Sequence, residues 1–234
     1  NRFLVHTSTA TRPEDGQPGY EYGAGTHFNP NVTWWNKSAP FLQYIGRCQY
    51  LLQQGLFVAD ILYYNGDWAP NIVLPKQLEP KGYDYDVCNE EVLLTRLSVK
   101  NGKIVLPDGM SYHILVLPDT TRMPVPVLQK IKELVQAGAT VIGPKPTQDP
   151  GLLNYPQCDA QIQEIAAGID YRDTPLQEVL KSRSIGPDFI HSDNNAFIDF
   201  IHRAIGDTDL YFVANRNNSA VQTTGSFRVT GKKV

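Results

Sequence analysis

The sequence predicts an α/β fold with a central parallel sheet covered by helices, and three adjoining segments indicate it. Residues 113–117 form a short apolar run that ends at Pro118. A helical pattern follows, in which one stripe is apolar: Val127, Leu128, Ile131, Leu134 and Val135. Residues 140–142 form a second apolar run before Gly143. Two apolar strands joined by an amphipathic helix are expected to lie parallel, through a right-handed crossover, in a sheet covered on both faces.

Composition is that of a globular protein and argues against two classes of partner. Hydrophobic residues make up 41% and charged residues 19% of the chain, which is enough for a sizeable core. The net charge of -3 argues against non-specific binding to nucleic acid or to a membrane surface. No apolar run approaches the roughly 20 residues that span a bilayer. The three cysteines are widely spaced and predict neither a disulfide framework nor a zinc site.

The first nine residues resemble a buried strand that emerges into a polar loop. Residues 3–5 are apolar, and polar residues follow from His6 to Thr9. Active-site side chains gather at the carboxyl ends of strands in sheets and barrels, which makes His6 a candidate. For His6 alone, a strand followed by a solvated turn fits as well.

Residues 25–35 contain the strongest candidate site in the sequence. His27, Asn29, Trp34 and Trp35 lie together in one loop before a helix. Amide and imidazole groups supply directed hydrogen bonds, and indole faces supply an apolar platform, so the loop suits a polyhydroxylated ligand. The alternative is that the tryptophan pair packs one domain onto another.

The segments between this loop and the central unit predict helices, strands and one hairpin. A helix is expected from Ser38, as N-cap, to Gly55, with a core-facing stripe of Phe41, Leu42, Ile45, Cys48, Leu51 and Leu52. A strand is predicted at 58–64, and Asp67 and Trp68 after it are secondary site candidates. A helix is predicted at 87–96, and a hairpin at 97–106 around the favoured turn pair Asn101-Gly102.

Beyond residue 144 the predicted elements change from helices to strands. Helices are expected at 159–167 and 175–181, the second capped by Thr174, and a linker at 186–195. Strands are expected at 197–203, 209–215 and 226–230. Strands without helices are typical of a β-sandwich, but three strands cannot close one, so an incomplete sandwich is predicted.

Motifs that would give the central sheet its own chemistry are missing. No GxGxxG, GxxxxGK[ST] or GxSxG motif follows a predicted strand. None of Cys48, Cys88 and Cys158 follows a strand through the tight turn that a glutaminase nucleophile requires. The sheet is therefore predicted to be structural, or to form the rim of another site.

Several segments resemble the large α-L-rhamnosidases of glycoside hydrolase family 106. They are NRFLVHTST, GTHFNPNVTWW, the passage FLQYIGRCQYLLQQGLFVADILYYNGDWAPN, GYDYDVCN, LPDGMSYHILVLPD and VANRNNSAVQTTGSFRVTGK. The resemblance covers nearly the whole chain and implies three parts. Residues 1–56 would be the last unit of a catalytic (β/α)8 barrel with an active-site loop, residues 57–190 a flavodoxin- or glutaminase-like α/β domain, and residues 191–234 the start of a β-sandwich.

The same resemblance implies an activity and its partners. Such enzymes remove terminal α-L-rhamnose from glycans with inversion, using an acid and a base carboxylate. The family's catalytic glutamates come from earlier barrel strands, and Glu14, Glu21, Glu90 and Glu91 match no such motif, so the catalytic residues stay unassigned. His6, His27, Asn29, Trp34 and Trp35 are the predicted sugar contacts. Calcium, a secreted or periplasmic location, and the remainder of a larger enzyme as partner are also implied.

Two alternatives remain at this stage. The chain is a non-catalytic carbohydrate-binding or assembly module if no catalytic carboxylates belong to it. A flavodoxin-like enzyme acting on a small molecule is the other, and the missing phosphate loop disfavours it.

Overall fold

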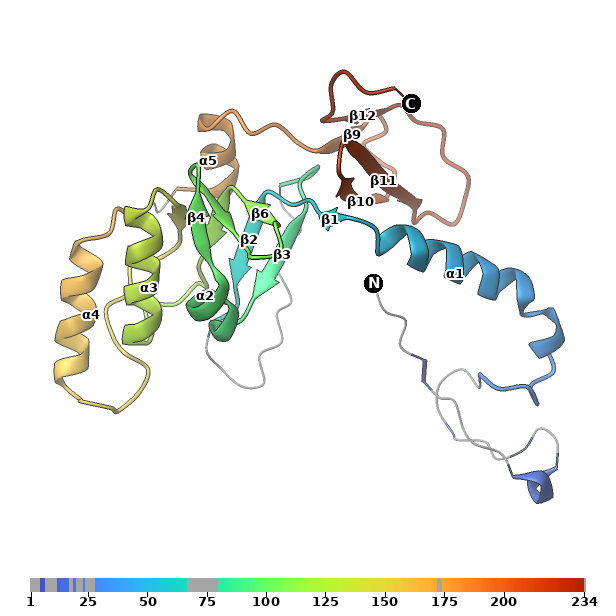
Figure 1. The fold of residues 1–234 in the computed structure, drawn as a ribbon, viewed down its shortest axis with the longest axis horizontal. Helices are drawn as coiled ribbons and strands as arrows, with labels where there is room; N and C mark the ends of the chain where they lie inside the picture. Colours follow the sequence, from blue (N-terminus) through green and yellow to red (C-terminus); the bar gives the residue numbers. More distant parts are fainter. Residues whose placement is uncertain are drawn as a thin grey trace. The chain divides into compact units, whose positions relative to one another are not determined.

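The computed structural model describes residues 5–6, 12–16, 19, 23, 28–66, 80–171 and 174–233. The chain divides into two compact units, residues 1–55 and residues 56–234. Figure 1 shows the helices and strands of both units, with labels where there is room. The finer division expected from the sequence, with a limit after residue 190, stays a prediction.

Among its described residues, the first unit has two short 3-10 helices and one α-helix. The elements are η1 (Pro13–Asp15), η2 (Trp35–Lys37) and α1 (Ala39–Leu52). Ser38 precedes α1 as expected, but its side chain makes no capping hydrogen bond. Instead its backbone N–H donates to the carbonyl of Trp35 at 2.9 Å, which leads the chain from η2 into α1. Ser38 is therefore the N-cap residue, as predicted, but it does not cap the helix through its side chain.

The apolar stripe of α1 is largely uncovered. The sequence predicts it as core-facing, yet Cys48 is the one buried residue of the helix. Phe41 is 53% exposed, and Leu42 and Leu51 are also exposed. Burial depends on what packs against a helix, and the described residues of this unit do not cover this one.

A four-stranded parallel sheet forms the centre of the second unit. Its strands are β2 (Ile61–Tyr64), β3 (Tyr85–Cys88), β7 (Ile114–Val116) and β8 (Thr140–Ile142), in the order β3-β2-β7-β8. Each neighbouring pair is parallel. The helix α3 (Val125–Gln136) joins β7 to β8, and Gly138 after it has φ 102°. The predicted parallel sheet, crossover helix and left-handed helix end are confirmed.

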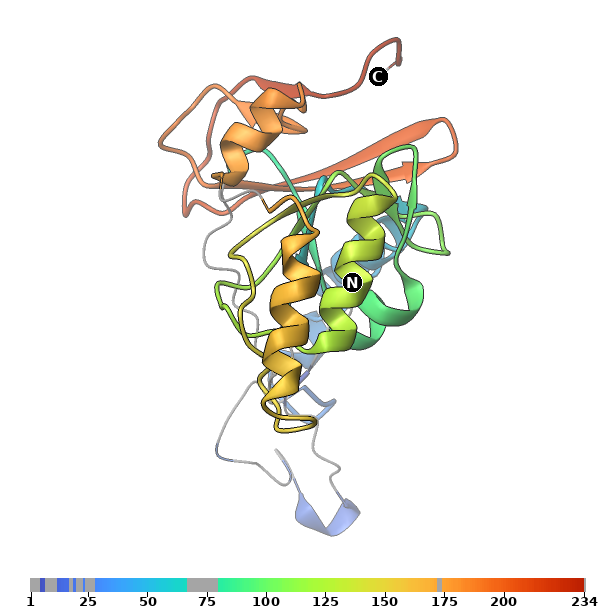
Figure 2. The same ribbon diagram turned by 90° about the vertical axis from the view of Figure 1, so that its left-hand side faces the viewer.

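Helices cover both faces of this sheet. Successive side chains of a strand point to opposite faces, and here both sets of side chains are apolar. One face, which includes Leu62 and Leu115, joins the core with α2 (Glu90–Arg96), α3 and α4 (Gln157–Ala167). The other, which includes Ile61 and Ile114, packs on α5 (Leu176–Ser182). Figures 1 and 2 both show α3 and α4 side by side.

The helix α2 begins later than the sequence pattern predicts. Val87 and Cys88 belong to β3, and the helix starts at Glu90. The carboxamide oxygen of Asn89 accepts the N–H of Val92 at 3.0 Å, so Asn89 is the N-cap.

The predicted hairpin is present as part of a small antiparallel sheet. Its strands are β4 (Ser98–Lys100), β5 (Lys103–Val105) and β6 (Ser111–Tyr112). Asn101 and Gly102 have φ values of 53° and 73°. Positive φ at both positions is what a type I′ turn requires, so this prediction is confirmed.

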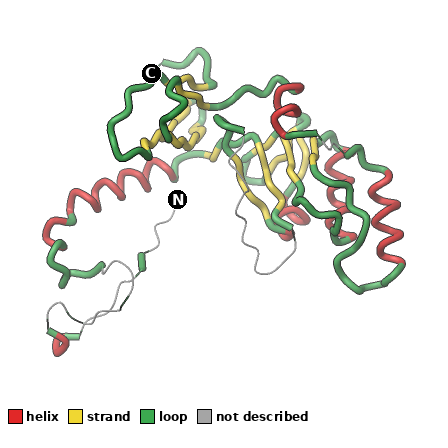
Figure 3. Tube along the Cα trace, turned by 180° about the vertical axis from the view of Figure 1, so that it is seen from behind, coloured by secondary structure: helices red, strands yellow, loops and turns green. Residues whose placement is uncertain are grey.

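Two further antiparallel sheets lie in the last part of the second unit. One contains β1 (Leu56–Phe57), β10 (Ile198–Ile205) and β11 (Thr208–Asn215), and the other pairs β9 (Phe189–His191) with β12 (Gly225–Phe227). Figure 3 shows these strands joined by loops. The predicted linker at 186–195 thus contains a strand, which the sequence missed because its partner lies more than thirty residues later. In the predicted third strand, residues 228–230 are not strand.

Gly82 lies where the loop before β3 meets the segment before β9. Its carbonyl accepts the N–H groups of Asp188 at 2.6 Å and of Phe189 at 3.2 Å. It has φ 87°, and a Cβ at this position would lie 2.6 Å from the carbonyl oxygen of Phe189 and 2.7 Å from Cβ of Pro187. The close approach therefore requires a glycine.

We expect Gly82→Ala to lower the free energy of unfolding by about 2–4 kcal/mol, because left-handed strain and a backbone clash add. Chemical denaturation measures the loss. Gly186→Ala is the control, since a Cβ there meets nothing within 4 Å. Equal stability of Gly82→Ala and the unchanged chain would contradict the geometry.

Candidate functional site

The loop before α1 gathers three aromatic rings. The ring centroids of Phe28 and Trp35 are 5.3 Å apart with an edge-on arrangement. Trp34 lies 5.7 Å from Phe28 and 6.1 Å from Trp35. All three side chains are half-buried. Each ring packs against the other two and keeps part of its surface open, as expected of an aromatic platform.

Asn29 has a structural role in the same loop. It is 7% exposed, and its carboxamide oxygen accepts the N–H of Asn31 at 2.8 Å. This contact closes an Asx turn that shapes the loop beside the rings. The acceptor side of the amide is therefore engaged, and a sugar contact by Asn29 would use its NH2 group as donor.

The structure brings together only some of the predicted site residues. Asn29, Trp34 and Trp35 form one cluster with Phe28, while His6 is exposed on a separate described segment. His27, Asp67 and Trp68 lie outside the described residues. The sugar-contact role of these side chains stays a prediction.

The described residues of the second unit line two neighbouring cavities, and no carboxylate lines either of them. They measure about 690 Å³ and 500 Å³ and share Ser184, Ile185 and Gly186. Two-carboxylate glycoside hydrolysis needs an acid and a base flanking the scissile bond. Because no aspartate or glutamate lines either cavity, neither provides that pair.

Three carboxylates of the described residues, those of Glu90, Glu91 and Asp84, are candidates for an acid or a base, but their contacts indicate structural roles. Glu90 and Glu91 lie in the first turn of α2, where the helix dipole favours negative charge. Burial raises the pKa of Asp84 to about 6, a value that would suit a general acid. Asp84 lines neither cavity, and its side chain accepts the N–H of Tyr85 at 2.9 Å. A raised pKa alone therefore does not make Asp84 an acid catalyst.

Cys88 is the last residue of β3, an edge strand of the parallel sheet, and its surroundings do not favour the thiolate form that a nucleophile needs. It is 4% exposed, and burial, followed by the charge of Asp86, raises its pKa to about 12. A nucleophilic cysteine needs a lowered pKa. This agrees with the absence of a glutaminase motif in the sequence.

An ion pair between a buried carboxylate and a partly exposed guanidinium connects the start of β2 to the segment after β12. The guanidinium of Arg228 donates to both carboxylate oxygens of Asp60 at 3.0 and 2.9 Å, and the Asp60 side chain is 3% exposed. Burial raises the pKa of Asp60, and the hydrogen bond and charge of Arg228 oppose that rise. No motif in the sequence predicted this pair.

A second polar cluster adjoins the first through Asp188. The imidazole of His202 lies between two carboxylates, 2.8 Å from Asp188 and 2.9 Å from Asp209. The Tyr211 hydroxyl donates to Asp188 at 2.7 Å, and its ring stacks on His202 with centroids 4.0 Å apart. Arg228 lies 3.7 Å from the same aspartate. The network therefore joins β10 and β11 to the residues around β9 and β12.

These contacts decide the protonation of His202. Burial disfavours its charged form, but the hydrogen bonds with Asp188 and Asp209 outweigh burial and raise its pKa. The hydrogen bond from His202 lowers the pKa of Asp209 in turn. The cluster is therefore stabilised with a charged imidazole between the carboxylates.

The described residues show neither a cluster of metal-ligating side chains nor a helix that could span a membrane. No group of three or more potential metal-ligating side chains lies together within them. Both ring nitrogens of His202 are engaged by carboxylates, so that cluster is not an exception. In the same residues, no helix combines the length and apolar character needed to cross a bilayer.

Comparison with known proteins gives a family and two relatives. A family model for alpha-L-rhamnosidase, glycoside hydrolase family 106, matches residues 1–234. A Formosa agariphila protein named "Putative beta-glucuronidase" is 38% identical over 241 residues, which cover 99% of this chain and 20% of that protein. The solved structure of a rhamnosidase from Novosphingobium sp. PP1Y matches with a TM-score of 0.86 and 28% identity, over 98% of this chain and 24% of that one. The chain thus spans between a fifth and a quarter of these relatives.

The raised pKa of His202 predicts how stability depends on pH. Its stabilising contribution is complete below the unfolded value of about 6.5 and is lost as pH rises through the higher folded pKa. We expect the stability advantage of the unchanged chain over His202→Gln to shrink on going from about pH 6 to pH 9, measured by urea denaturation.

His113→Gln is the matched comparison, because burial lowers the pKa of His113 to about 4. The neutral His113 stabilises the fold above about pH 6.5, and that contribution is lost as pH falls toward 4. A pH-independent difference between His202→Gln and the unchanged chain would contradict the assignment.

Proposed function

The chain belongs to the α-L-rhamnosidase family of glycoside hydrolases, and on this basis we propose that it is part of an enzyme that removes terminal α-linked rhamnose from glycans. The observation that carries the proposal is the family match over residues 1–234. The rhamnosidase structure supports it, since the likeness extends over 98% of this chain.

We infer that hydrolysis is inverting and that its acid and base lie outside this chain. An inverting pair flanks the scissile bond with carboxyl groups about 6.5–9.5 Å apart, which leaves room for the attacking water. Supporting this, no carboxylate lines either described cavity, and the two glutamates of α2 lie in its first turn, where the helix dipole favours their charge.

The proposed division assigns residues 1–56 to the end of a catalytic barrel, 57–190 to a glutaminase-like α/β domain and 191–234 to the start of a β-sandwich. The uncovered apolar stripe of α1 supports the first assignment, because a stripe of this kind usually marks a surface that another part of a protein covers. The buried, high-pKa Cys88 supports a structural role for the α/β domain.

The loop before α1 is the part of the chain that we expect to touch the sugar. The partly open rings of Trp34 and Trp35 suit stacking on a sugar face, and Asn29 is held beside them by its turn. His6 and His27 complete the proposed set as hydrogen-bonding groups. In this scheme the chain binds and orients rhamnose, while proton transfer is carried out by residues elsewhere.

A non-catalytic carbohydrate-binding or assembly module is the alternative. The absence of carboxylates from the two cavities favours it for this chain taken alone. The two proposals differ in whether the loop residues affect turnover.

The test uses the enzyme that contains this chain, with aryl α-L-rhamnoside as substrate. We expect Asn29→Asp to lower kcat/KM by about 10- to 100-fold without lowering Tm by more than a few degrees. Aspartate keeps the oxygen that accepts the N–H of Asn31 but loses the NH2 donor. Asn29→Ala removes both, so it should lower Tm as well. Nuclear magnetic resonance of the released sugar reports inversion.

Phe197→Ala is the control, because this exposed ring belongs to neither the loop nor a cavity. Unchanged kcat/KM in Asn29→Asp would remove Asn29 from the sugar contacts. Turnover of an aryl β-glucuronide in place of the rhamnoside would overturn the proposed substrate.

A further inference from the structure

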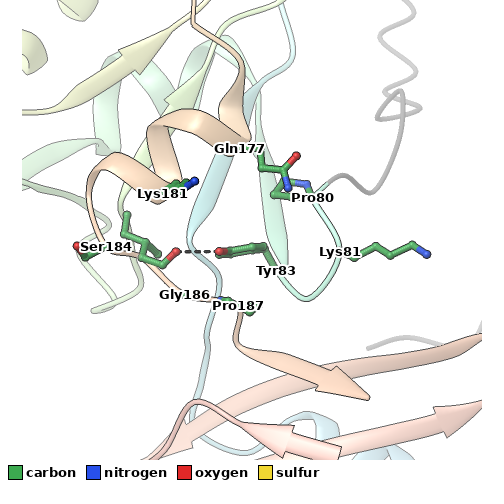
Figure 4. A pocket seen from close by; sticks show the side chains of 9 residues that line it. Pro80, Lys81, Tyr83, Gln177, Lys181, Ser184, Gly186 and Pro187 are labelled. Atoms are coloured by element: carbon green, nitrogen blue, oxygen red, sulfur yellow. Dashed lines mark hydrogen bonds between the residues drawn. The ribbon is translucent and has the colours of Figure 1, made fainter. Parts of the chain in front are cut away.

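The segment of residues 184–186 runs between the two cavities of the second unit. One cavity, of about 690 Å³, lies toward Tyr83 and α5, and the other, of about 500 Å³, toward the Asn101-Gly102 turn and His113. Figure 4 shows the first, with Gln177 and Lys181 contributed by α5. The Tyr83 hydroxyl donates to the carbonyl of Ile185 at 2.8 Å, which fixes the segment. We call the two cavities together the 184–186 groove.

The side chains of the groove carry positive charge and no negative charge. Its five cations are Lys81, Lys103, Lys181, Arg183 and Arg228, and no aspartate or glutamate lines it. The chain as a whole has a net charge of -3. The groove is therefore a local concentration of positive charge on an otherwise acidic protein.

Within the described residues, four of these five cations form no ion pair within 4 Å, and Arg228 is the exception. Arg228 is paired with the buried Asp60. Of the other four, Lys103 and Arg183 line the smaller cavity. Lys103 stands on β5, and Arg183 directly follows α5. Lys81 points away from α5 in Figure 4, so it contributes less.

The surroundings of Lys103 and Arg183 are rigid and polar. Ser184 has φ 57°, and the N–H of Ile185 donates to the carbonyl of Leu180 at 3.0 Å, so the end of α5 is closed by its own backbone. His113, whose imidazole lies 3.8 Å from Asp60, is held neutral because burial, assisted by the charges of Lys103, Arg228 and Arg183, lowers its pKa to about 4. Neutral imidazole supplies one donor and one acceptor.

We propose that the 184–186 groove binds an acidic oligosaccharide, whose carboxylate or sulfate group lies between Lys103 and Arg183. Asn101, Gln177 and Ser184, which line the groove, supply hydrogen-bonding groups for sugar hydroxyls. The choice of a glycan rests on the proposed function, and the choice of an acidic one rests on the unpaired cations. A single-stranded nucleic acid fits less well, because it needs several stacking rings and Tyr83 is the one aromatic side chain in the lining apart from the His113 imidazole.

The test is calorimetric titration of this chain with an oligogalacturonide, a sulfated oligosaccharide and a neutral malto-oligosaccharide of equal length. We expect the first two to bind and the neutral one not to bind. Lys103→Ala/Arg183→Ala should weaken binding about tenfold or more, and high salt should weaken it too, because the contacts are between exposed charges.

Lys130→Ala/Lys145→Ala is the control, since it removes the same charge from residues outside the groove. Circular dichroism confirms that both double variants stay folded. Equal binding of neutral and acidic sugars, no binding of either, equal loss in the two double variants, or tighter binding of an oligonucleotide would each overturn the proposal. The titration measures binding and not hydrolysis. Failure of this proposal can therefore be told apart from failure of the proposed rhamnosidase function, because either test can succeed while the other fails.

Discussion

The ion pair between the buried carboxylate of Asp60 and the partly exposed Arg228 ties together two distant parts of the second unit. It links residues 168 positions apart, one at the start of the parallel sheet and the other just after the last strand. Removing Arg228 would leave the buried carboxylate of Asp60 without its partner, which is destabilising because a buried charge needs compensation. The carboxyl-terminal strands are therefore tied to the α/β sheet by a contact that neither part supplies alone.

The same pair shapes the chemistry of the surface beside it. The charge of Arg228 is compensated by Asp60, whereas Lys103 and Arg183, which line the same cavity, form no ion pair within the described residues. Arg228 also lies 3.7 Å from Asp188. The carboxylate of Asp188 in turn binds His202 on β10 and Tyr211 on β11. Arg228 thus contacts both Asp60 and Asp188 and also lines the smaller cavity.

Local features of the fold could be predicted from the sequence, and long-range contacts could not. The strand-helix-strand unit at 113–144 is predicted from the spacing of its apolar residues, and the turn at Asn101-Gly102 from the residue types that such turns favour. Both signals come from neighbouring residues in the sequence. The strand β9 and the partners of Asp60 depend on residues far along the chain, which no local signal reveals. For the candidate site, sequence placed Asn29, Trp34 and Trp35 in one loop. It did not show that Asn29 closes a turn, or that cations gather around 184–186.

The account holds that this chain binds and positions the sugar, while the acid and base belong to other residues. The most direct test is hydrolysis of an aryl α-L-rhamnoside by this chain alone, with and without calcium. We predict no turnover in either case, because the described cavities lack the paired carboxylates that the reaction requires. Clear turnover would show a complete site within these residues and would contradict the central claim.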